Sequence, residues 1–445
     1  MNPTRVETLP PGPGDPAEEQ SRRFAEDPFG YVEELHERYG DAFTLQLGKL
    51  GNEKFVDIPN NGAWVFLTTP EQIRTMYGAE DGAVSGALAN SIFFGTVDGS
   101  VSYIDGVAHR RRRSLVQPSF SGRRDYVDTI RSAVERNLAL WPVGRPFSLL
   151  RALQEITAES IVDVVCGNLD VADRRQLAAL LPALENAASS EQQVRSAESS
   201  IREFVEQRLD GYPMRCDGGG DVLEGLLRSA AAGSSDIHRE VVADEVFGLL
   251  FTGFSTTANT LAWVFLHILD DADVRAAVVE ELGPEFRSRP MTPETFAGLR
   301  CLDAVVSEAL RLHPVSAING VRMVTGPLVV ADHLLPAGTI LVHCAHLLQR
   351  RPELFERPDV FDPLRFLGSS ADPYAWAPFG GGDRMCVGRG YAREEMKIIL
   401  ALVLSAVDLE STAGIPPARQ QGIFMAPADG ATCTVTGIAH HGRRR

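Results

Sequence analysis

Apolar residues recur three and four positions apart over most of the chain, which is the pattern of helices with one buried face. This spacing predicts helices within residues 125–141, 148–167, 173–189, 201–212 and 304–314. Residues 237–269 contain no proline, and their second half is apolar on nearly all sides. They predict a long helix of roughly 50 Å through the interior. Its middle, Thr252–Thr257, holds a glycine and several hydroxyl residues, which can bend a helix.

Shorter apolar or alternating runs predict strands within residues 43–48, 55–59, 62–70, 321–345 and 431–438. Residues 27–40 predict a short capped helix that ends at a glycine. Residues 1–22 are rich in proline, glycine and glutamate and predict a loose lead-in, while residues 439–445 predict a frayed tail. We find no internal repeat and no clear linker. The pattern therefore favours one domain over residues 23–438, a mainly α fold with a small β-rich lobe.

The charge of the chain and its lack of targeting signals argue against several classes of protein. Lysine and arginine number 43 against 59 aspartate and glutamate, a net charge of −16 that argues against binding nucleic acid or acidic lipid. The longest strongly apolar run, Ile398–Val407, is about half of the ~20 residues that a membrane span needs. The first residues lack the apolar core of a signal peptide. We therefore expect a cytoplasmic protein without a membrane span.

The sharpest local feature is a glycine-rich loop around one cysteine. Three consecutive glycines precede Cys386, Gly388 and Gly390 follow it, and a strongly helical segment comes next. Such a loop brings backbone amides close to a thiolate, which a helix N-terminus also stabilises. A phosphate loop would need a βαβ unit or a GxxxxGK[ST] string, and neither is present. A metal-bound thiolate and a cysteine nucleophile both remain open, because the sequence cannot place a distant base. The six cysteines form no CxxC pair, so a zinc ribbon or disulfide framework is disfavoured.

Four motifs in order resemble those of the cytochrome P-450 family. Phe379–Gly388 matches the pattern Phe-Gly-x-Gly-x-Arg/His-x-Cys-x-Gly at every fixed position. Thr252–Thr257 is similar to the Ala-Gly-x-Asp/Glu-Thr-Thr segment of the family's central helix, Glu308–Arg311 to its Glu-x-x-Arg helix, and Phe361–Phe366 to its Phe-x-Pro-x-Arg-Phe segment. The resemblance extends from about residue 9 to about residue 438. It implies the cytochrome P-450 fold, with heme b between the central helix and the cysteine loop.

The resemblance also implies roles for individual residues. Cys386 would be the axial thiolate ligand of the haem iron, in a loop that includes Phe379 and Gly380. The candidates for binding the two haem propionates are basic: His109, Arg113, Arg322 and Arg384. His109 and Arg113 stand four residues apart and would share one helix face. A structural network that fixes the cysteine loop would be made by Glu308, Arg311 and Arg365.

One position departs from the family pattern. Thr256, the central threonine, is retained for oxygen activation, but Ser255 stands where the family has an acid that delivers protons. The departure puts well-coupled hydroxylation in doubt, although a serine can relay a proton through water.

These features predict a soluble, bacterial-type haem-thiolate monooxygenase. It would use O2 and two electrons to oxidise a small apolar molecule of natural-product type, such as a terpenoid, polyketide or cyclic peptide. A ferredoxin or flavodoxin-like donor with its reductase would supply the electrons. It would dock on a local basic patch drawn from Arg110–Arg112, Arg389, Arg393 and Lys397. The alternatives are a peroxide-using or oxidative-coupling enzyme of the same fold, and a haem carrier or sensor without turnover.

Overall fold

The computed structural model divides into two compact units. It describes residues 6–47, 62–94, 100–121, 125–167, 169–184, 191–212, 221–233, 237, 239–368, 371–421 and 424–438. Unit 1 comprises Met1–Ser114, Ser316–Val360 and Ala371–Cys386. Unit 2 comprises Leu115–Val315, Phe361–Ser370 and Val387–Arg445. Each unit is thus assembled from three separate stretches of sequence, and the single domain expected over residues 23–438 stays a prediction.

Unit 1 is built around a five-stranded sheet with the order β1-β2-β8-β5-β3. Its strands are β1 (Ala42–Gln46), β2 (Ala63–Leu67), β3 (Val84–Ser85), β5 (Asn319–Val324) and β8 (Ile340–His343). β2 and β8 pair in parallel, with Trp64 opposite Ile340, and the other pairs are antiparallel. All residues of β2 and β8 are buried. A two-stranded ribbon, β6 (Leu328–Val330) and β7 (His333–Leu335), adds its apolar side chains to the same core.

Short helices surround this sheet: α1 (Ala17–Glu26), α2 (Pro28–Tyr39), α4 (Pro70–Tyr77), α5 (Gly86–Phe94), α16 (Ala345–Leu348) and the 3-10 turns η1 (Val101–Tyr103) and η6 (Gly382–Arg384). The α2 helix begins after Asp27, whose carboxylate accepts the N–H of Gly30, and ends at Gly40 as predicted. The α4 helix begins with a reciprocal capping box between Thr69 and Gln72. The α6 helix (Gly106–Val116) crosses the sequence boundary between the two units.

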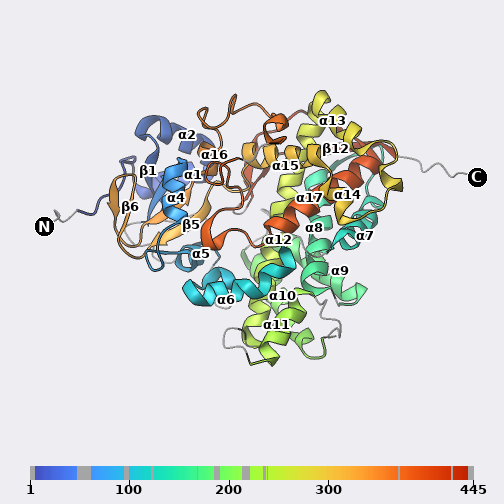
Figure 1. Cartoon of the computed structure of the whole chain (residues 1–445), viewed down its shortest axis with the longest axis horizontal. Coiled ribbons are helices and arrows are strands. Elements are labelled where there is room, and N and C mark those ends of the chain that lie inside the picture. The colour runs from blue at the N-terminus through green and yellow to red at the C-terminus, as the bar shows by residue number, and fades with distance from the viewer. Residues whose placement is uncertain are drawn as a thin grey trace, which may run out of the picture. The chain divides into compact units, whose positions relative to one another are not determined.

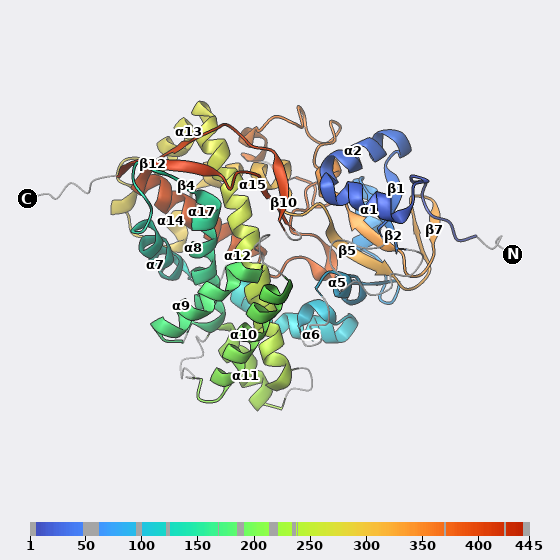
Figure 2. The same ribbon diagram turned by 180° about the vertical axis from the view of Figure 1, so that it is seen from behind.

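Unit 2 is a helical assembly around α12 (Arg239–Asp270), the long helix that the sequence predicts. The α12 helix packs against α8 (Leu149–Cys166), α10 (Glu191–Leu209), α11 (Val222–Ala231), α15 (Arg300–Leu312) and α17 (Arg389–Ala406). Figures 1 and 2 show α8 and α17 beside α12 from both sides. The remaining helices are α7 (Val127–Leu138), α9 (Val171–Leu180), α13 (Ala272–Leu282) and α14 (Pro293–Ala297), with 3-10 turns η2 (Gln117–Phe120), η3 (Leu181–Leu184), η4 (Phe286–Ser288) and η5 (Pro363–Phe366).

Two small sheets complete unit 2. One has the order β4-β12-β9, made of β4 (Pro146–Ser148), β9 (Val407–Ser411) and β12 (Thr432–Ile438). The other is a hairpin of β10 (Ala418–Gln421) and β11 (Phe424–Pro427). The predicted strand over residues 431–438 is confirmed as β12.

Three sequence-based boundaries need correction. The lead-in is not loose throughout, because α1 begins at Ala17, inside the expected residues 1–22. The helix predicted over residues 173–189 changes to a 3-10 turn at Leu181, next to the helix-breaking Pro182. The helix expected from residue 201 already begins at Glu191. The predicted strand at 55–59 and the tail at 439–445 lie outside the described residues.

One helix is long and apolar enough to cross a membrane by length and composition. It is the segment Val241–Asp270 of α12, and its most apolar window is 78% buried inside the protein. This burial is typical of a core helix.

Candidate functional site

The cysteine loop lies in unit 1 and presents Cys386 at the surface. The backbone N–H of Cys386 donates to the carbonyl of Phe379 at 2.8 Å, which closes the loop. Gly380 and Gly382 have φ values of 69° and 63°, in the left-handed region that favours glycine. The Cys386 side chain is exposed, so a ligand can reach its sulfur.

Tyr77, at the end of α4, packs beneath this loop. A Cβ added to Gly381 would lie 2.5 Å from Cδ2 of the Tyr77 ring, and one added to Gly382 would lie 2.5 Å from the Tyr77 carbonyl oxygen. The Tyr77 hydroxyl is 3.1 Å from Nδ1 of His343 on β8. Burial raises the pKa of Tyr77 to about 12. Sequence analysis missed this residue, because no local signal links position 77 to a loop some 300 residues later.

Unit 1 also gathers the four basic residues expected to bind propionates. His109 is buried on α6, and burial, followed by the charges of Arg384 and Arg113, lowers its pKa to about 4. Burial is also the main reason that the pKa of Arg113 is lowered, while the Cys386 thiolate acts in the opposite direction. Burial lowers the pKa of Arg322 to about 10, and the nearby Arg384 adds to the effect. The four groups are therefore close enough to influence one another.

Backbone carbonyls and one carboxylate fix the guanidinium groups of this cluster. Arg384 donates to the carbonyls of Ser102 and Ile104, and it forms an ion pair with Asp105 at 2.5 Å. Arg322 donates to the carbonyl of Val321 at 2.8 Å. Asp105 was also missed at the sequence level, since it looks like an ordinary loop residue before α6.

The basic cluster fits the two carboxylates of haem. Arg113, Arg322 and Arg384 are cations that raise one another's electrostatic energy, and the buried His109 is neutral at pH 7. Anionic groups placed among them would relieve this repulsion. The exposed thiol in the same unit is a suitable soft ligand for iron.

The hydroxyl residues of the central helix lie in unit 2. Helix α12 is continuous through Thr252–Thr257. The hydroxyl of Thr256 donates to the carbonyl of Thr252 at 3.1 Å, and that of Thr260 donates to the carbonyl of Thr256 at 2.9 Å. Thr256 is partly exposed. Ser255 is buried, and its hydroxyl accepts from the side-chain amide of Asn259 at 3.3 Å.

The predicted network of Glu308, Arg311 and Arg365 is assembled within unit 2. Glu308 and Arg311 are both fully buried on α15 and form two hydrogen bonds of 2.8 Å. Arg365 of η5 donates to Glu308 at 3.1 Å, and the backbone N–H of Asp362 donates to the same carboxylate at 2.9 Å. The carboxylate therefore holds η5 against α15.

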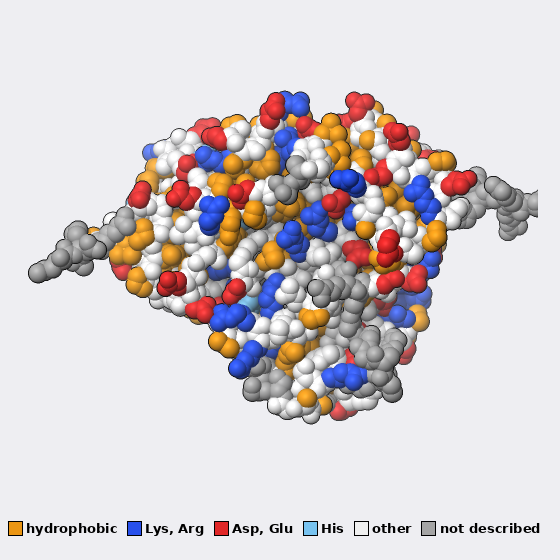
Figure 3. All heavy atoms as spheres, viewed as in Figure 1, with side chains coloured by type: hydrophobic (Ala, Val, Ile, Leu, Met, Phe, Trp, Pro, Cys, Tyr) orange, Lys and Arg blue, Asp and Glu red, His pale blue; other side chains and the backbone are white. Residues whose placement is uncertain are grey.

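The basic patch expected for an electron donor needs correction. Arg112 is buried, so it is not a surface contact. Arg393 and Lys397 both pair with Asp303, at 2.6 and 3.6 Å. Arg110 is exposed but pairs with Asp81 at 3.0 Å. Basic side chains still gather over the position of α6 in Figure 3, where Arg111 is also exposed.

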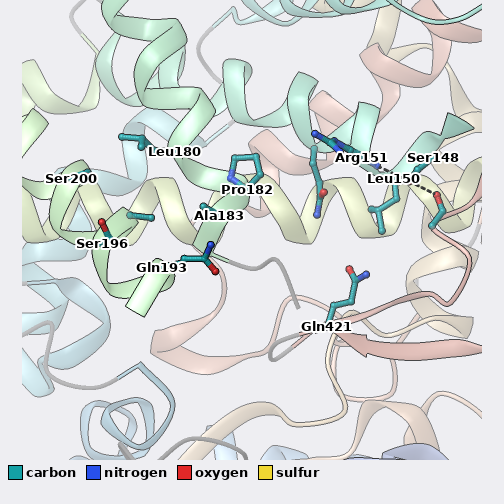
Figure 4. Close-up of a pocket in the computed structure, with 13 residues that line it drawn as sticks. Ser148, Leu150, Arg151, Leu180, Pro182, Ala183, Gln193, Ser196, Ser200 and Gln421 are labelled. Carbon is teal, nitrogen blue, oxygen red and sulfur yellow. Dashed lines mark hydrogen bonds between the residues drawn. The ribbon is translucent and has the colours of Figure 1, made fainter. Parts of the chain in front are cut away.

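Unit 2 contains a cavity of about 700 Å³ between α8, the η3 region, α10 and the hairpin β10-β11. Figure 4 shows its side chains, among them Gln193 and Gln421 from opposite sides. Its lining mixes aliphatic residues with uncharged polar ones and a single arginine: Ser148, Leu150, Arg151, Gln154, Leu180, Pro182, Ala183, Gln193, Ser196, Ala197, Ser200, Gln421 and Gly430.

Known proteins share both the sequence and the fold of this chain. The family model described as Cytochrome P-450 matches residues 180–434. "Putative cytochrome P-450 138" of Mycobacterium tuberculosis is 31% identical over 96% of this chain and 96% of the relative. "Putative cytochrome P-450 135B1" of Mycobacterium bovis is 28% identical over 98% of this chain and 93% of its own length. The solved structure of retinoic acid bound cyanobacterial CYP120A1 matches with a TM-score of 0.80 at 21% identity, over 97% of this chain and 100% of that one. With a matching family model over more than half its length, this chain belongs to the cytochrome P-450 family of haem-thiolate monooxygenases.

Proposed function

We propose that Cys386 is the axial ligand of heme b and that the protein oxidises a small organic molecule at this centre. The observation that carries the proposal is the exposed thiol of Cys386. It lies in the same unit as a cluster of arginines whose mutual repulsion anionic groups would relieve. A bound haem would supply the chemistry that activates O2 with two electrons. Tyr77 packs closely against Gly381 and Gly382 and so supports the loop that carries the thiolate.

The propionate-binding role belongs, in this proposal, to Arg113, Arg322, Arg384 and His109. Neutral His109 would donate one hydrogen bond, while the arginines would supply both charge and several N–H donors. The network of Glu308, Arg311 and Arg365 has a structural role in this proposal, because both arginines form ion pairs with Glu308.

The lining of the cavity in unit 2, which is aliphatic and uncharged polar apart from Arg151, supports the substrate class in this proposal. Such a lining suits a largely apolar natural product that carries a few amide or hydroxyl groups. Electrons would come from a ferredoxin or flavodoxin-like donor with its reductase. Spectral titration with terpenoids, polyketides and cyclic peptides tests the substrate class.

The first prediction tests the haem ligand. The reduced protein should bind CO with the red-shifted Soret band of thiolate ligation, and Cys386→Ser should abolish that band. Cys301→Ser is the matched control, because Cys301 is also partly accessible but lies in unit 2. A band that survives Cys386→Ser, or disappears in Cys301→Ser, would contradict the assignment.

A peroxide-using enzyme of the same fold is the second candidate. The observation that favours it is Ser255, a buried hydroxyl at the position of the family's acid. Turnover driven by peroxide in the absence of any electron donor would favour this candidate. Turnover that requires NAD(P)H and a donor chain would favour the monooxygenase.

A further inference from the structure

Asp105 lies at a junction between elements of unit 1, and the function proposed above gives it no role. It stands directly before α6, and its backbone carbonyl accepts the N–H of His109 in the first turn of that helix at 3.3 Å. Its side chain faces the start of α5, where the N–H groups of Gly86 and Ala87 donate to Oδ1 at 3.2 and 3.4 Å. The Ser85 hydroxyl donates to Oδ2 at 2.5 Å. One residue thus joins the first turns of two helices.

Arg384 adds the cysteine loop to this junction. Its guanidinium group pairs with Oδ1 of Asp105 at 2.5 Å, and it donates to the carbonyls of Ser102 and Ile104. A Cβ added to Gly86 would overlap the Arg384 side chain, so this side chain passes α5 at a place where glycine leaves room for it. Only 11% of the Arg384 side chain is exposed. Several contacts therefore hold the arginine in one position.

Asp105 is a carboxylate at neutral pH. Burial alone would raise its pKa, but hydrogen bonds from Ser85 and Ala87 and the charge of Arg384 outweigh burial and lower the pKa from its ordinary value of 3.8. The contact between Asp105 and Arg384 is therefore an ion pair, which is stronger and more directional than a hydrogen bond between neutral groups.

Two effects of this carboxylate on anion binding oppose each other. An arginine that is already held in place loses little rotamer freedom when an anion binds it, whereas a mobile arginine loses more. The charge of Asp105, in contrast, weakens the attraction of the basic cluster for an anion. The Asp105 side chain is 40% exposed, so water screens this charge beyond the direct contact with Arg384. We expect the benefit of fixed geometry to exceed the electrostatic loss.

We propose that Asp105 is a positioning residue for haem binding, because it holds Arg384 at the start of α6 before haem is bound. His109 and Arg113 lie on α6, four and eight residues after Asp105. Arg384 lies in the cysteine loop, two residues before Cys386. The ion pair therefore fixes the expected propionate-binding groups of α6 relative to that of the loop. The inference rests on the proposed function and concerns how firmly haem is retained.

Transfer of haem from the holoenzyme to an excess of apomyoglobin measures this retention. Asp105→Asn should release haem several-fold faster than the parent, because asparagine keeps an oxygen for the start of α5 but has no charge for Arg384. Asp81→Asn is the matched control, since it removes the same charge from an exposed acid of unit 1 that pairs with Arg110. It should release haem at the parent's rate. Slower or unchanged release in Asp105→Asn would overturn the proposal.

A double-mutant cycle separates positioning from a purely structural role. Arg384→Gln alone should release haem faster than Asp105→Asn, since it removes the cation itself. If Asp105 acts through Arg384, Asp105→Asn should have little further effect in the Arg384→Gln protein. A role limited to capping α5 would speed release by the same factor in both backgrounds, and that result would contradict the proposal.

Gly86→Ala gives an independent test that changes no charge. Its methyl group would overlap the Arg384 side chain and displace it from Asp105, so haem release should again be faster than in the parent. Should Asp105→Asn not fold, the question is decided by Gly86→Ala and by Ser85→Ala, which removes the hydroxyl that donates to Asp105. Release at the parent's rate in both would overturn the proposal.

The outcomes separate this inference from the proposed function. Each protein is first checked for the red-shifted CO band of the reduced holoenzyme. A parent without that band contradicts the haem-thiolate assignment itself. A parent with the band, together with an Asp105→Asn protein that releases haem at the parent's rate, overturns the positioning role alone.

Discussion

At the scale of single residues, the choice of glycine in the cysteine loop depends on Tyr77, which packs against the loop. The sequence predicts a tight turn from its three glycines, but it does not predict the ring that makes them necessary. Gly381 has an extended backbone with φ of −157°, which any residue can adopt. Its constraint is therefore the Tyr77 ring and not its own conformation. The need for glycine at this position arises from a contact with a residue far away in the sequence, so a local sequence pattern cannot predict it.

Gly381→Ala should destabilise the protein by about 1–3 kcal/mol, because its new methyl group would overlap the buried Tyr77 ring. Gly14→Ala is the control, since a Cβ there would meet no atom within 4 Å. Urea unfolding of the two variants measures the difference. An equal midpoint for Gly381→Ala and Gly14→Ala would show that Tyr77 does not support the loop.

The buried Glu395 of α17 also makes stability depend on pH. Its pKa is about 8 in the folded protein against an ordinary value of 4.5, so the folded state holds a proton that the unfolded state has lost between these values. Its contribution to stability is fully present below pH 4.5 and decreases as the pH rises towards 8. We expect Glu395→Gln to gain stability relative to the parent over this range, by at most about 1.4 kcal/mol per pH unit. Denaturant unfolding at several pH values checks the sign, and a difference that is constant with pH would contradict it.

At the scale of elements, periodicity predicts the helices well and their ends less well. The long apolar run became α12, and the Asp27 and Gly40 signals mark the ends of α2 correctly. The start of α10 was missed, because Glu191 begins a polar turn that has no apolar periodicity. The Glu-x-x-Arg spacing placed two charges one turn apart on α15. It could not show that both are completely buried, since burial depends on the elements that cover them.

The buried pair predicts a large cost for losing one partner. Arg311→Met leaves the carboxylate of Glu308 buried with only Arg365 beside it, so we expect a loss of about 3–5 kcal/mol. Arg393→Met is the control, because its partly exposed pair with Asp303 should contribute at most about 1 kcal/mol. The double variant Glu308→Gln with Arg311→Met should regain part of the loss. Chemical denaturation measures all three, and similar costs for Arg311→Met and Arg393→Met would rule out the network as a structural anchor.

At the scale of the whole molecule, sequence motifs predicted the family and the fold. The walls of the cavity come from residues 148–154, 180–200 and 421–430, which are brought together only by folding. Side chains on these segments look like ordinary helix-surface and hairpin residues in the sequence. The substrate class was therefore expected from the resemblance, and only the folded unit 2 supplies an independent argument for it.

At the same scale, the charge of the protein affects how an electron donor docks. The net charge of −16 repels an acidic electron donor as a whole, so docking requires a local basic surface. Of the arginines first expected to form it, Arg112 is buried, and Arg111 of α6 is exposed.

Arg111→Glu should slow reduction by an acidic ferredoxin several-fold at low salt without changing the CO band. Raising the salt from 0.1 M to 1 M shortens the Debye length from about 10 Å to about 3 Å and should remove most of this difference. Arg22→Glu on α1 changes the net charge equally and serves as the control in stopped-flow reduction. Equal slowing by both reversals would mean that the donor responds to the total charge and not to a surface at α6.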